Sequence, residues 1–371
     1  MRFYSVDTLT GRMVGELCPS KWELGEPLRS PGTGSLTFPL DTGLSELILH
    51  RRRWVAAEDG GRVIWCGPVP RRPQRTGGEV IVPLVDWRSW FYRAPIRPFP
   101  DGTRRDYIKT GANAREQASI MADLLGLALD APGTPAMVVD TPPVTGVTRE
   151  ITALMLDRST GEYLESVSAR GGCEWHVYAT QIGATDMLLH AAVDWPERQH
   201  RTEPVKLEWR QGQGGNVTAY TWPEGEESPT KVWGVGEGEP PDQVWASDEY
   251  PELGDGTDVL WEAVAGPLDG VKKSATAYDH ANEAIARARG FEGLAQFTVT
   301  AEQLPFSAVD VGDRARVVLS DGWIDVDLPA CRIVDRVMSG GRGEATVQTL
   351  TVDLSDPIYP GDPGEDVPED E

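Results

Sequence analysis

Short apolar runs separated by turn residues dominate the first 94 residues and limit what this part of the chain can fold into. Arg62–Val69 and Val80–Val85 are rich in β-branched residues, and Pro73 and the pair Gly77–Gly78 lie between them. This pattern is typical of paired strands joined by a longer turn. Further strands are expected at Arg2–Asp7, Arg12–Glu16, Lys21–Leu24, Ser35–Pro39 and Glu46–His50. Short strands at such close spacing favour a sandwich or barrel over a parallel sheet.

An aromatic segment closes this first unit. Trp87, Trp90, Phe91 and Tyr92 lie close together and are expected to form a helical turn that plugs the end of the sheet. The sequence therefore predicts a β-barrel-like domain over residues 1–94, and it points to an assembly module rather than to an enzyme.

The hydrophobic period changes after a Pro-, Arg- and Asp-rich linker. Ala114, Ala118, Met121 and Leu125 are spaced by four, three and four residues, so they share one helical face. Asn113 is the expected N-cap, with Glu116 placed to complete a capping box. A helix near residues 113–127 is predicted.

A second helix is expected at residues 161–170, with Gly171 and Gly172 as its stop signal. Strands at Cys173–Ala179 and Met187–Ala192 follow it. Together these segments predict an α+β domain over residues 95–204, built from helices and a strand pair.

The remainder returns to β-rich patterning. Residues 205–293 are expected to hold strands in "VKLEWRQG", "GNVTAYTW", "KVWGVGEG" and "DVLWEAV", interrupted by a helix at residues 276–289. Residues 294–353 are expected to form a second β-barrel-like domain, with strands at Gln296–Thr300, Arg314–Leu319, Trp323–Leu328, Arg332–Met338 and Thr346–Asp353. Residues 354–371 are acidic and Pro-rich, and disorder is predicted there. The fold class is thus α+β and mainly β.

The length and net charge of the chain disfavour several classes of protein function. The chain has 371 residues, enough for about two to four domains. Its net charge is −23, and residues 111–371 hold 46 acidic against 18 basic side chains. Such an acidic excess repels a phosphate backbone, which disfavours sequence-specific nucleic-acid binding. No run is long and apolar enough for a membrane span, and no signal peptide is evident.

Motifs for catalysis, cofactors or metals are weak. The string "WGVGEGEP" at Trp233–Pro240 opens no predicted helix, so it is interpreted as a turn whose backbone packs against a neighbouring strand rather than as a phosphate loop. Cys173 and His176 give half of a zinc spacing, without a second pair. The four cysteines stand singly, which favours buried free thiols. No catalytic, cofactor-binding or metal-binding residue is assigned, although acidic pairs for glycoside cleavage remain open.

One basic cluster is a candidate for partner contacts. It consists of Arg51, Arg52, Arg53, Arg71, Arg72 and Arg75. Strand alternation would divide these side chains between two faces, so a solvated strand edge and a partner-facing patch both remain possible interpretations.

Taken in order, these segments resemble the tail hub family of long-tailed bacteriophages, also called baseplate hub or minor tail proteins, in the form found in actinobacteriophages. The resemblance rests on "VIWCGPVPRR…EVIVPLVDWRSWFYRAPI", the helix near Asn113, the double glycine leading to "CEWHVYA", and "KVWGVGEGE". The late helix, "VDVGDRARVVL" and "CRIVDRVMSGGRGEATVQTL" complete it. The set covers most of the chain and is specific only as an ordered series.

The resemblance implies a structural virion protein at the tail tip, made in the host bacterial cytoplasm. It implies a homotrimer in which two β-barrel domains per subunit form a pseudo-sixfold ring. That ring would connect the tail tube and distal tail protein to the central tip parts during host cell attachment and genome ejection. The tape-measure protein and DNA would pass through it, the DNA without sequence-specific binding, and no cofactor or membrane insertion is implied. Many relatives continue into wall-degrading or receptor-binding segments, which this sequence lacks after its last predicted strand.

A second hypothesis from another class stays open. Exposed tryptophans such as Trp222, Trp233 and Trp245 could stack on sugars, which would make the chain a tail-associated carbohydrate-binding protein or cell-wall glycosidase. The expectation that the chain is not an enzyme follows from the absence of a recognisable catalytic constellation.

Overall fold

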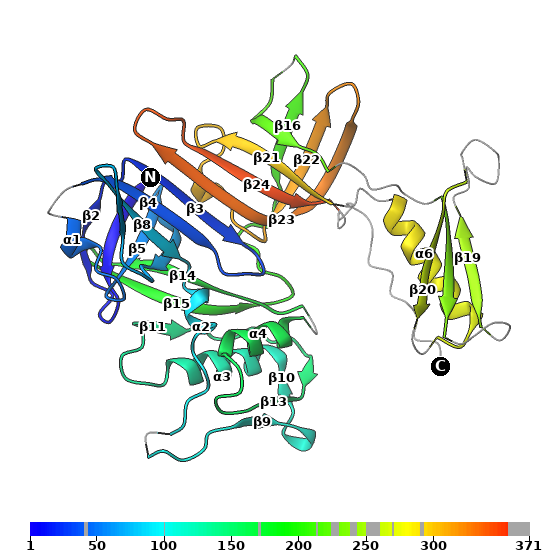
Figure 1. Ribbon diagram of the computed structural model, residues 1–371, viewed down its shortest axis with the longest axis horizontal. Coiled ribbons are helices and arrows are strands. Elements are labelled where there is room, and N and C mark those ends of the chain that lie inside the picture. The colour runs from blue at the N-terminus through cyan, green and yellow to red at the C-terminus, as the bar shows by residue number, and fades with distance from the viewer. Residues whose placement is uncertain are drawn as a thin grey trace. The chain divides into compact units, whose positions relative to one another are not determined.

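The computed structural model describes most of the chain in two compact units (Figure 1). The large unit comprises Met1–Ala219, Phe297–Asp327 and Ile333–Thr351, and the small unit comprises Tyr220–Gln296, Leu328–Arg332 and Val352–Glu371. The described residues are 1–40, 44–99, 101–169, 172–212, 214–223, 230–237, 243–249, 260–268, 271–289 and 293–354. The predicted acidic tail therefore lies outside them, apart from its first residue.

The N-terminal strands contribute to two sheets. The first has the order β2 (Met13–Leu17), β1 (Arg2–Asp7), β5 (Arg53–Asp59) and β6 (Arg62–Pro68). The other strands of this region, β3 (Lys21–Pro27), β4 (Thr33–Pro39), β7 (Gln74–Thr76) and β8 (Glu79–Val85), belong to a ten-stranded sheet. Strand alternation places apolar side chains of both sheets in one core.

The C-terminal strands complete the ten-stranded sheet. They are β16 (Val205–Arg210), β17 (Val217–Thr221), β21 (Leu294–Thr300), β22 (Arg314–Ser320), β23 (Asp325–Gly341) and β24 (Val347–Asp353). Strand β23 pairs antiparallel with β3 from Asp335↔Pro27 to Gly341↔Lys21, so strands from the N-terminal and C-terminal regions of the sequence share one sheet. Met338 of β23 and Phe306 of the short η2 helix (Phe306–Ala308) join the N-terminal core.

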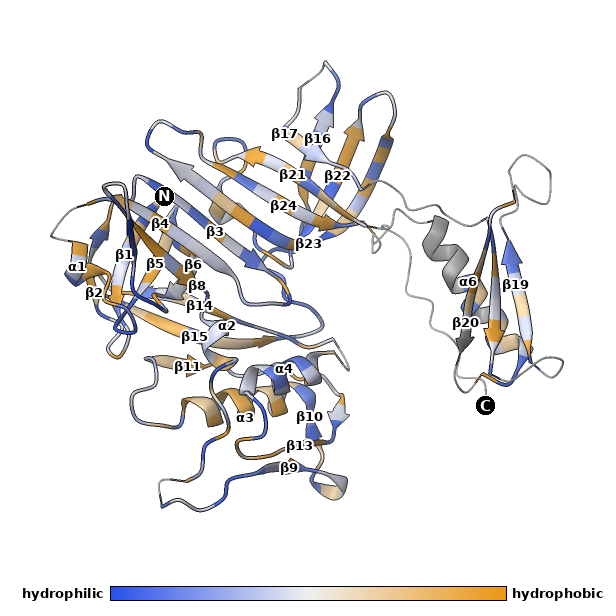
Figure 2. Ribbon diagram, viewed as in Figure 1, coloured by the Kyte–Doolittle hydropathy of each residue, from blue (hydrophilic) through white to orange (hydrophobic). Residues whose placement is uncertain are grey.

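Residues between the two halves of this sheet form the expected helix and strand pair. Helices α3 (Gln117–Leu129) and α4 (Thr160–Ser168) pack near β14 (Glu174–Ile182), β15 (Asp186–Asp194) and β11 (Met137–Val139). The hydrophobic residues of α3 stand out in Figure 2. Smaller elements here are β9 (Tyr107–Lys109), η1 (Gly111–Asn113), β10 (Arg115–Glu116), β12 (Thr148–Arg149) and β13 (Ile151–Ala153).

The aromatic segment after β8 forms the expected helical turn, α2 (Arg88–Phe91). The Phe91 ring meets the Trp175 ring of β14 edge-on, with their centroids 5.6 Å apart. This contact ties the end of the N-terminal strands to the core of the helix and strand region.

The small unit contains a three-stranded sheet, ordered β19 (Trp245–Glu249), β18 (Lys231–Gly236) and β20 (Glu262–Leu268), with helix α6 (Ser274–Arg289) packed on it. Trp233–Gly236 of the Gly-rich string is strand rather than turn, and residues 238–240 lie outside the described residues. The backbone of this string packs against neighbouring strands, as expected, since Gly234 pairs with Ala246 of β19 and with Ala265 of β20. Gly234 also lies close to a helix: a Cβ built there would lie 2.0 Å from the Ala277 carbonyl oxygen. The glycine lets α6 approach β18 closely.

Glu46–His50 is not a strand, so that prediction is wrong. The segment begins with α1 (Leu44–Leu47), because Leu44, Leu47 and Ile48 contact the N-terminal core at helical spacing. Arg51 then takes a left-handed φ of 62°, and the strand starts at Arg53 as β5. Sequence reasoning missed β5.

The expected cap at Asn113 is also wrong. Residues 115–116 pair with Thr148–Arg149 as extended backbone, which delays α3 until Gln117. The Glu116 carboxylate accepts a hydrogen bond from the Gly146 N–H at 2.7 Å instead of closing a capping box. The true capping box lies at α4, where Ser159 and Glu162 bond reciprocally.

Two further local expectations change. The strands predicted at Trp323–Leu328 and Arg332–Met338 form the single 17-residue strand β23, which begins at Asp325. Cys66, Cys173 and Cys331 are buried free thiols, as expected, whereas Cys18 is exposed.

The mainly β, α+β fold class is confirmed. The strands form open sheets, and the pairings of the described residues close no barrel. No helix in this described part of the chain has the length and apolar character to cross a membrane.

We expect Gly234→Ala to destabilise the small unit, because the added methyl group must displace the backbone of α6 at Ala277. Overpacking of this kind costs about 1–3 kcal/mol, which denaturant unfolding can measure. Gly126→Ala is the matched control, since a Cβ there meets nothing within 4 Å and lies inside α3. That control should stabilise slightly. Equal stabilities of the two variants would contradict the close packing.

Candidate functional site

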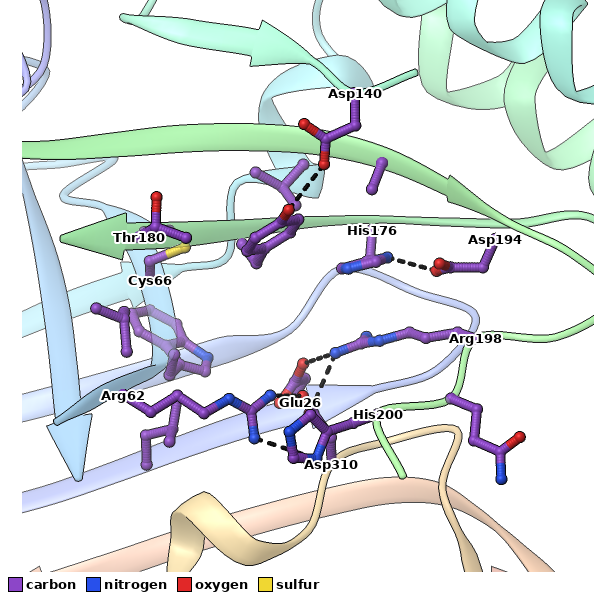
Figure 3. Close-up of a pocket in the computed structure, with 18 of the residues that line it drawn as sticks. Glu26, Arg62, Cys66, Asp140, His176, Thr180, Asp194, Arg198, His200 and Asp310 are labelled. Carbon is purple, nitrogen blue, oxygen red and sulfur yellow. Dashed lines mark hydrogen bonds and ion pairs between the residues drawn. The ribbon is translucent and has the colours of Figure 1, made fainter. Parts of the chain in front are cut away.

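A cavity of about 530 Å³ lies in the large unit, between β6 on one side and β14 and β15 on the other (Figure 3). Charged and aromatic side chains dominate its lining. They include Glu26, Arg62, Asp140, His176, Tyr178, Asp194, Arg198, His200 and Asp310. This concentration of polar groups around one cavity makes it the best candidate site within the described residues.

Asp310 is the centre of the lower wall in Figure 3. Its carboxylate accepts from Arg62 Nη2 at 2.6 Å, from Arg198 Nη2 at 3.2 Å and from Arg336 Nη2 at 3.2 Å. Glu26 provides a second carboxylate, 2.7 Å from Arg198 and 2.6 Å from Arg336. Three guanidinium groups therefore share two carboxylates.

The five residues of this network come from separate parts of the large unit. Glu26 lies on β3, Arg62 at the start of β6, Arg198 after β15, Asp310 after η2 and Arg336 on β23. Arg336 also donates to the carbonyl oxygens of Phe306, Val309 and Ile64. The network thus fixes the N-terminal, middle and C-terminal segments to one another.

Electrostatic interactions shift the pKa values of Asp310 and Arg198 toward their charged forms. Burial alone would raise the pKa of Asp310, but Arg198, Arg336 and Arg62 outweigh it and hold that pKa below its ordinary value. Burial would likewise lower the pKa of Arg198, whereas Asp310 and Glu26 raise it. Arg336 is fully buried, so loss of either carboxylate would leave a guanidinium group underpaired in the interior.

Three stacked rings lie on β14 and β15, and two of them, His176 and Tyr178, line the opposite wall of the cavity. The rings of Tyr178 and His190 stack with centroids 4.7 Å apart, and His176 stacks on Tyr178 at 5.3 Å. His176 Nδ1 lies 2.8 Å from a carboxylate oxygen of Asp194. Burial and the hydrogen bond to Asp140 raise the pKa of Tyr178 to about 12.

A chain of polar contacts connects a hydroxyl, an imidazole and a carboxylate, those of Thr180, His190 and Asp140. His190 Nδ1 lies 2.9 Å from Asp140, and His190 Nε2 lies 2.9 Å from the Thr180 hydroxyl. With a neutral imidazole, Nδ1 donates to the carboxylate and Nε2 accepts from the hydroxyl. The order is that of nucleophilic hydrolases, but Thr180 lies within the regular strand β14 rather than at a sharp turn beside oxyanion donors.

The His176 ring lies beside the Asp194 carboxylate, while Cys173 is buried in the core of the helix and strand region. Within the described residues, no group of three or more His, Cys, Asp and Glu side chains could hold a metal ion.

The arginines of the predicted basic cluster lie away from this cavity lining. The Arg51 N–H donates to the Val69 carbonyl at 3.0 Å, which brings the first three arginines close to the segment that leads to Arg71. Arg53 forms an ion pair with Asp7, whereas Arg51, Arg52, Arg71, Arg72 and Arg75 are exposed. Arg75 lies on β7, the edge strand of the ten-stranded sheet. The structure thus groups part of the cluster near one sheet edge, and a partner-binding role stays a prediction.

Sequence reasoning missed the Asp310 network, because its members are scattered from Glu26 to Arg336 and follow no motif. One signal was present at β23, where Arg336 falls on the same face as the buried Met338. A charge at such a position requires a buried partner.

The sequence matches no protein-family model. No curated protein matches it either.

Solved structures do match its fold. The 43 kDa tail protein of prophage MuSo2 from Shewanella oneidensis is 13% identical, with a TM-score of 0.55 over 96% of this chain and 98% of that one. The tail protein from Neisseria meningitidis MC58 is 11% identical, with a TM-score of 0.54 over 95% and 96%. A chain of the half-lidded Francisella PdpA–VgrG complex has a TM-score of 0.53 and 11% identity over 97% of this chain and 59% of its own. The chain therefore shares the fold of prophage tail proteins, which confirms the resemblance to phage tail proteins at the level of fold.

We expect Asp310→Asn to destabilise the large unit by about 3 kcal/mol at neutral pH, since the three arginines lose their shared charge. Denaturant unfolding measures this loss. Asp327→Asn is the matched control, because it removes an exposed pair with Arg316 and should cost about 1 kcal/mol or less. Similar losses for both variants would contradict the importance of the buried network.

The difference between wild type and Asp310→Asn should also depend on pH. A depressed folded-state pKa stabilises the protein above the unfolded value of about 3.9, and this contribution is lost as pH falls toward the folded value. The difference should therefore stay constant from neutral pH to about pH 5 and shrink below about pH 4. A difference that grows on acidification would overturn this assignment.

Proposed function

We propose that this chain is a structural component of a phage tail tip, a tail hub that assembles as a homotrimer. The observation that carries the proposal is the fold match to the Shewanella tail protein, which extends over 96% of this chain and 98% of that protein. A match along both whole chains supports a common architecture, and not merely one shared module.

In the proposed assembly, three subunits form a pseudo-sixfold ring between the tail tube with its distal tail protein and the central tip parts. Open sheets support this arrangement, because their edges offer unpaired backbone groups that closed rings can cover. The edge strand β7 is exposed along all three of its residues and carries Arg75 of the basic cluster. We infer that this edge and its arginines face a neighbouring tail protein.

Passage of the tape-measure protein and DNA through the ring belongs to the same proposal. The net charge of −23 supports it, since an acidic lining would keep a phosphate backbone from adhering. The proposed location is the virion tail tip, after synthesis in the cytoplasm of the host bacterium.

The oligomeric state is a direct test. Sedimentation of the purified full chain should give a trimer, alone or with its distal tail protein, and electron microscopy of the tail tip should place it in a ring. Replacing Arg71, Arg72 and Arg75 with Glu should reduce incorporation into tails while leaving the unfolding transition intact, because these side chains are exposed. A chain that stays monomeric with tail-tube components would count against the hub.

The proposal includes no enzymatic role, even though Thr180, His190 and Asp140 form a hydrolase-like series. Purified protein should neither clear a host cell-wall zymogram nor hydrolyse p-nitrophenyl acetate faster than its Thr180→Ala and His190→Ala variants. Clearing of the zymogram, or ester hydrolysis that both substitutions abolish, would refute the purely structural role.

A further inference from the structure

The sheet of the small unit has one face that α6 does not cover. Val232, Gly234 and Gly236 of β18 are buried, and Val232 packs with Ala281 of α6. Because side chains alternate along a strand, Lys231, Trp233 and Val235 of β18 point to the opposite face.

Pairing assigns neighbours to each of these three positions. Val235 lies opposite Trp245, and Trp233 lies between Ser247 of β19 and Val264 of β20. Directly paired residues share a face, so Trp245 and Val264 lie with Trp233 on the face opposite α6. Trp245 is 61% exposed and Val264 is 66% exposed, although both are apolar.

The two indole rings form a corner rather than a flat stack. Their centroids are 5.5 Å apart and their planes meet at 60°. A ligand ring placed against Trp245 would therefore also meet Trp233 at its side. Exposed apolar groups held together in this way mark a binding surface more often than a random surface position does.

Charged side chains lie next to the two tryptophan rings. Lys231 lies between Glu249 and Glu262 in the sheet register, and its Nζ is 2.8 Å from a Glu249 carboxylate oxygen. The same Nζ lies 4.9 Å from the Trp233 ring centroid. The Trp233 indole N–H donates to Glu262 at 2.8 Å. These contacts hold the rings and leave further carboxylate lone pairs available as acceptors beside them.

The size of the face favours a small ligand over a protein. Three strands and five residues along each span about 10 Å by 14 Å. A stable protein interface covers about 800 Å² per partner, several times this area.

We propose that this face binds a β-linked, gluco-configured oligosaccharide. In such sugars the hydroxyl groups are equatorial, so both faces of each ring present C–H groups that can stack on an indole. The same equatorial hydroxyls point outward, where the carboxylates of Glu249 and Glu262 can accept hydrogen bonds. Apolar rings beside charged acceptors thus match the two kinds of surface on one sugar. Trp222, which follows β17, lies outside this three-stranded sheet and takes no part.

Calorimetric titration of the full chain with chitotetraose and with cellotetraose tests the site. At least one of these probes should bind saturably with a Kd of about 1 mM or tighter. Trp245→Ala and Trp233→Ala should each weaken that binding at least about tenfold. Glu249→Gln should weaken it less, because it removes charge but keeps an acceptor oxygen.

Trp323→Ala is the matched control, because Trp323 is 96% exposed and lies in the large unit. It should bind like wild type. Circular dichroism of each variant establishes that the fold is retained, and Glu249→Gln gives an independent readout should a tryptophan variant fail to fold. Absence of saturable binding to either probe, or binding that survives both tryptophan substitutions, would overturn the proposal. Loss of tail assembly in Trp245→Ala without any sugar binding would also overturn it, in favour of a protein contact.

Discussion

The large unit depends on one set of interactions, the ion pairs that Asp310 and Glu26 form with three arginines. Arg62, Arg198 and Arg336 reach these carboxylates from three distant parts of the chain. Removing charges from water is costly, and only complete pairing with good geometry offsets that cost. The ion pairs of this network therefore all form only when three segments of the chain are folded together: the first strands, the segment after β15 and the last long strand.

Strand β23 connects this network to the N-terminal core. Its C-terminal half pairs with β3 and contributes Met338 to the N-terminal core. Arg336, between these contacts, carries its charge into the interior and meets Glu26 of the very strand that β23 pairs with. Backbone pairing and charge pairing thus fix the same register, since a slip of one residue would turn Arg336 to the opposite face and expose its partners.

The two units differ in how they use polar groups. In the large unit the charged side chains of the Asp310 network are largely buried and mutually paired, and the histidines of β14 and β15 lie beside carboxylates. In the small unit the comparable groups lie at the surface, where Lys231 and Glu262 hold the Trp233 ring in place. The first arrangement stabilises a scaffold, and the second keeps an apolar surface ordered while it remains open to solvent.

The sequence by itself determined the mainly β class, most strands, and the helix and strand-pair region, because alternating and helical hydrophobic periods are local properties of the chain. It also indicated the tail-protein fold through an ordered set of segments. Local signals failed where tertiary contacts decided the outcome. Glu46–His50 forms helix and turn because Leu47 and Ile48 contact the core, and the helix predicted to begin at Asn113 starts later because Arg115–Glu116 pair as a strand. Only the tertiary structure paired β3 with β23 in one sheet and gathered Glu26, Arg62, Arg198, Asp310 and Arg336. Their separation along the chain leaves no spacing to detect, since the distances that create the network exist only after folding.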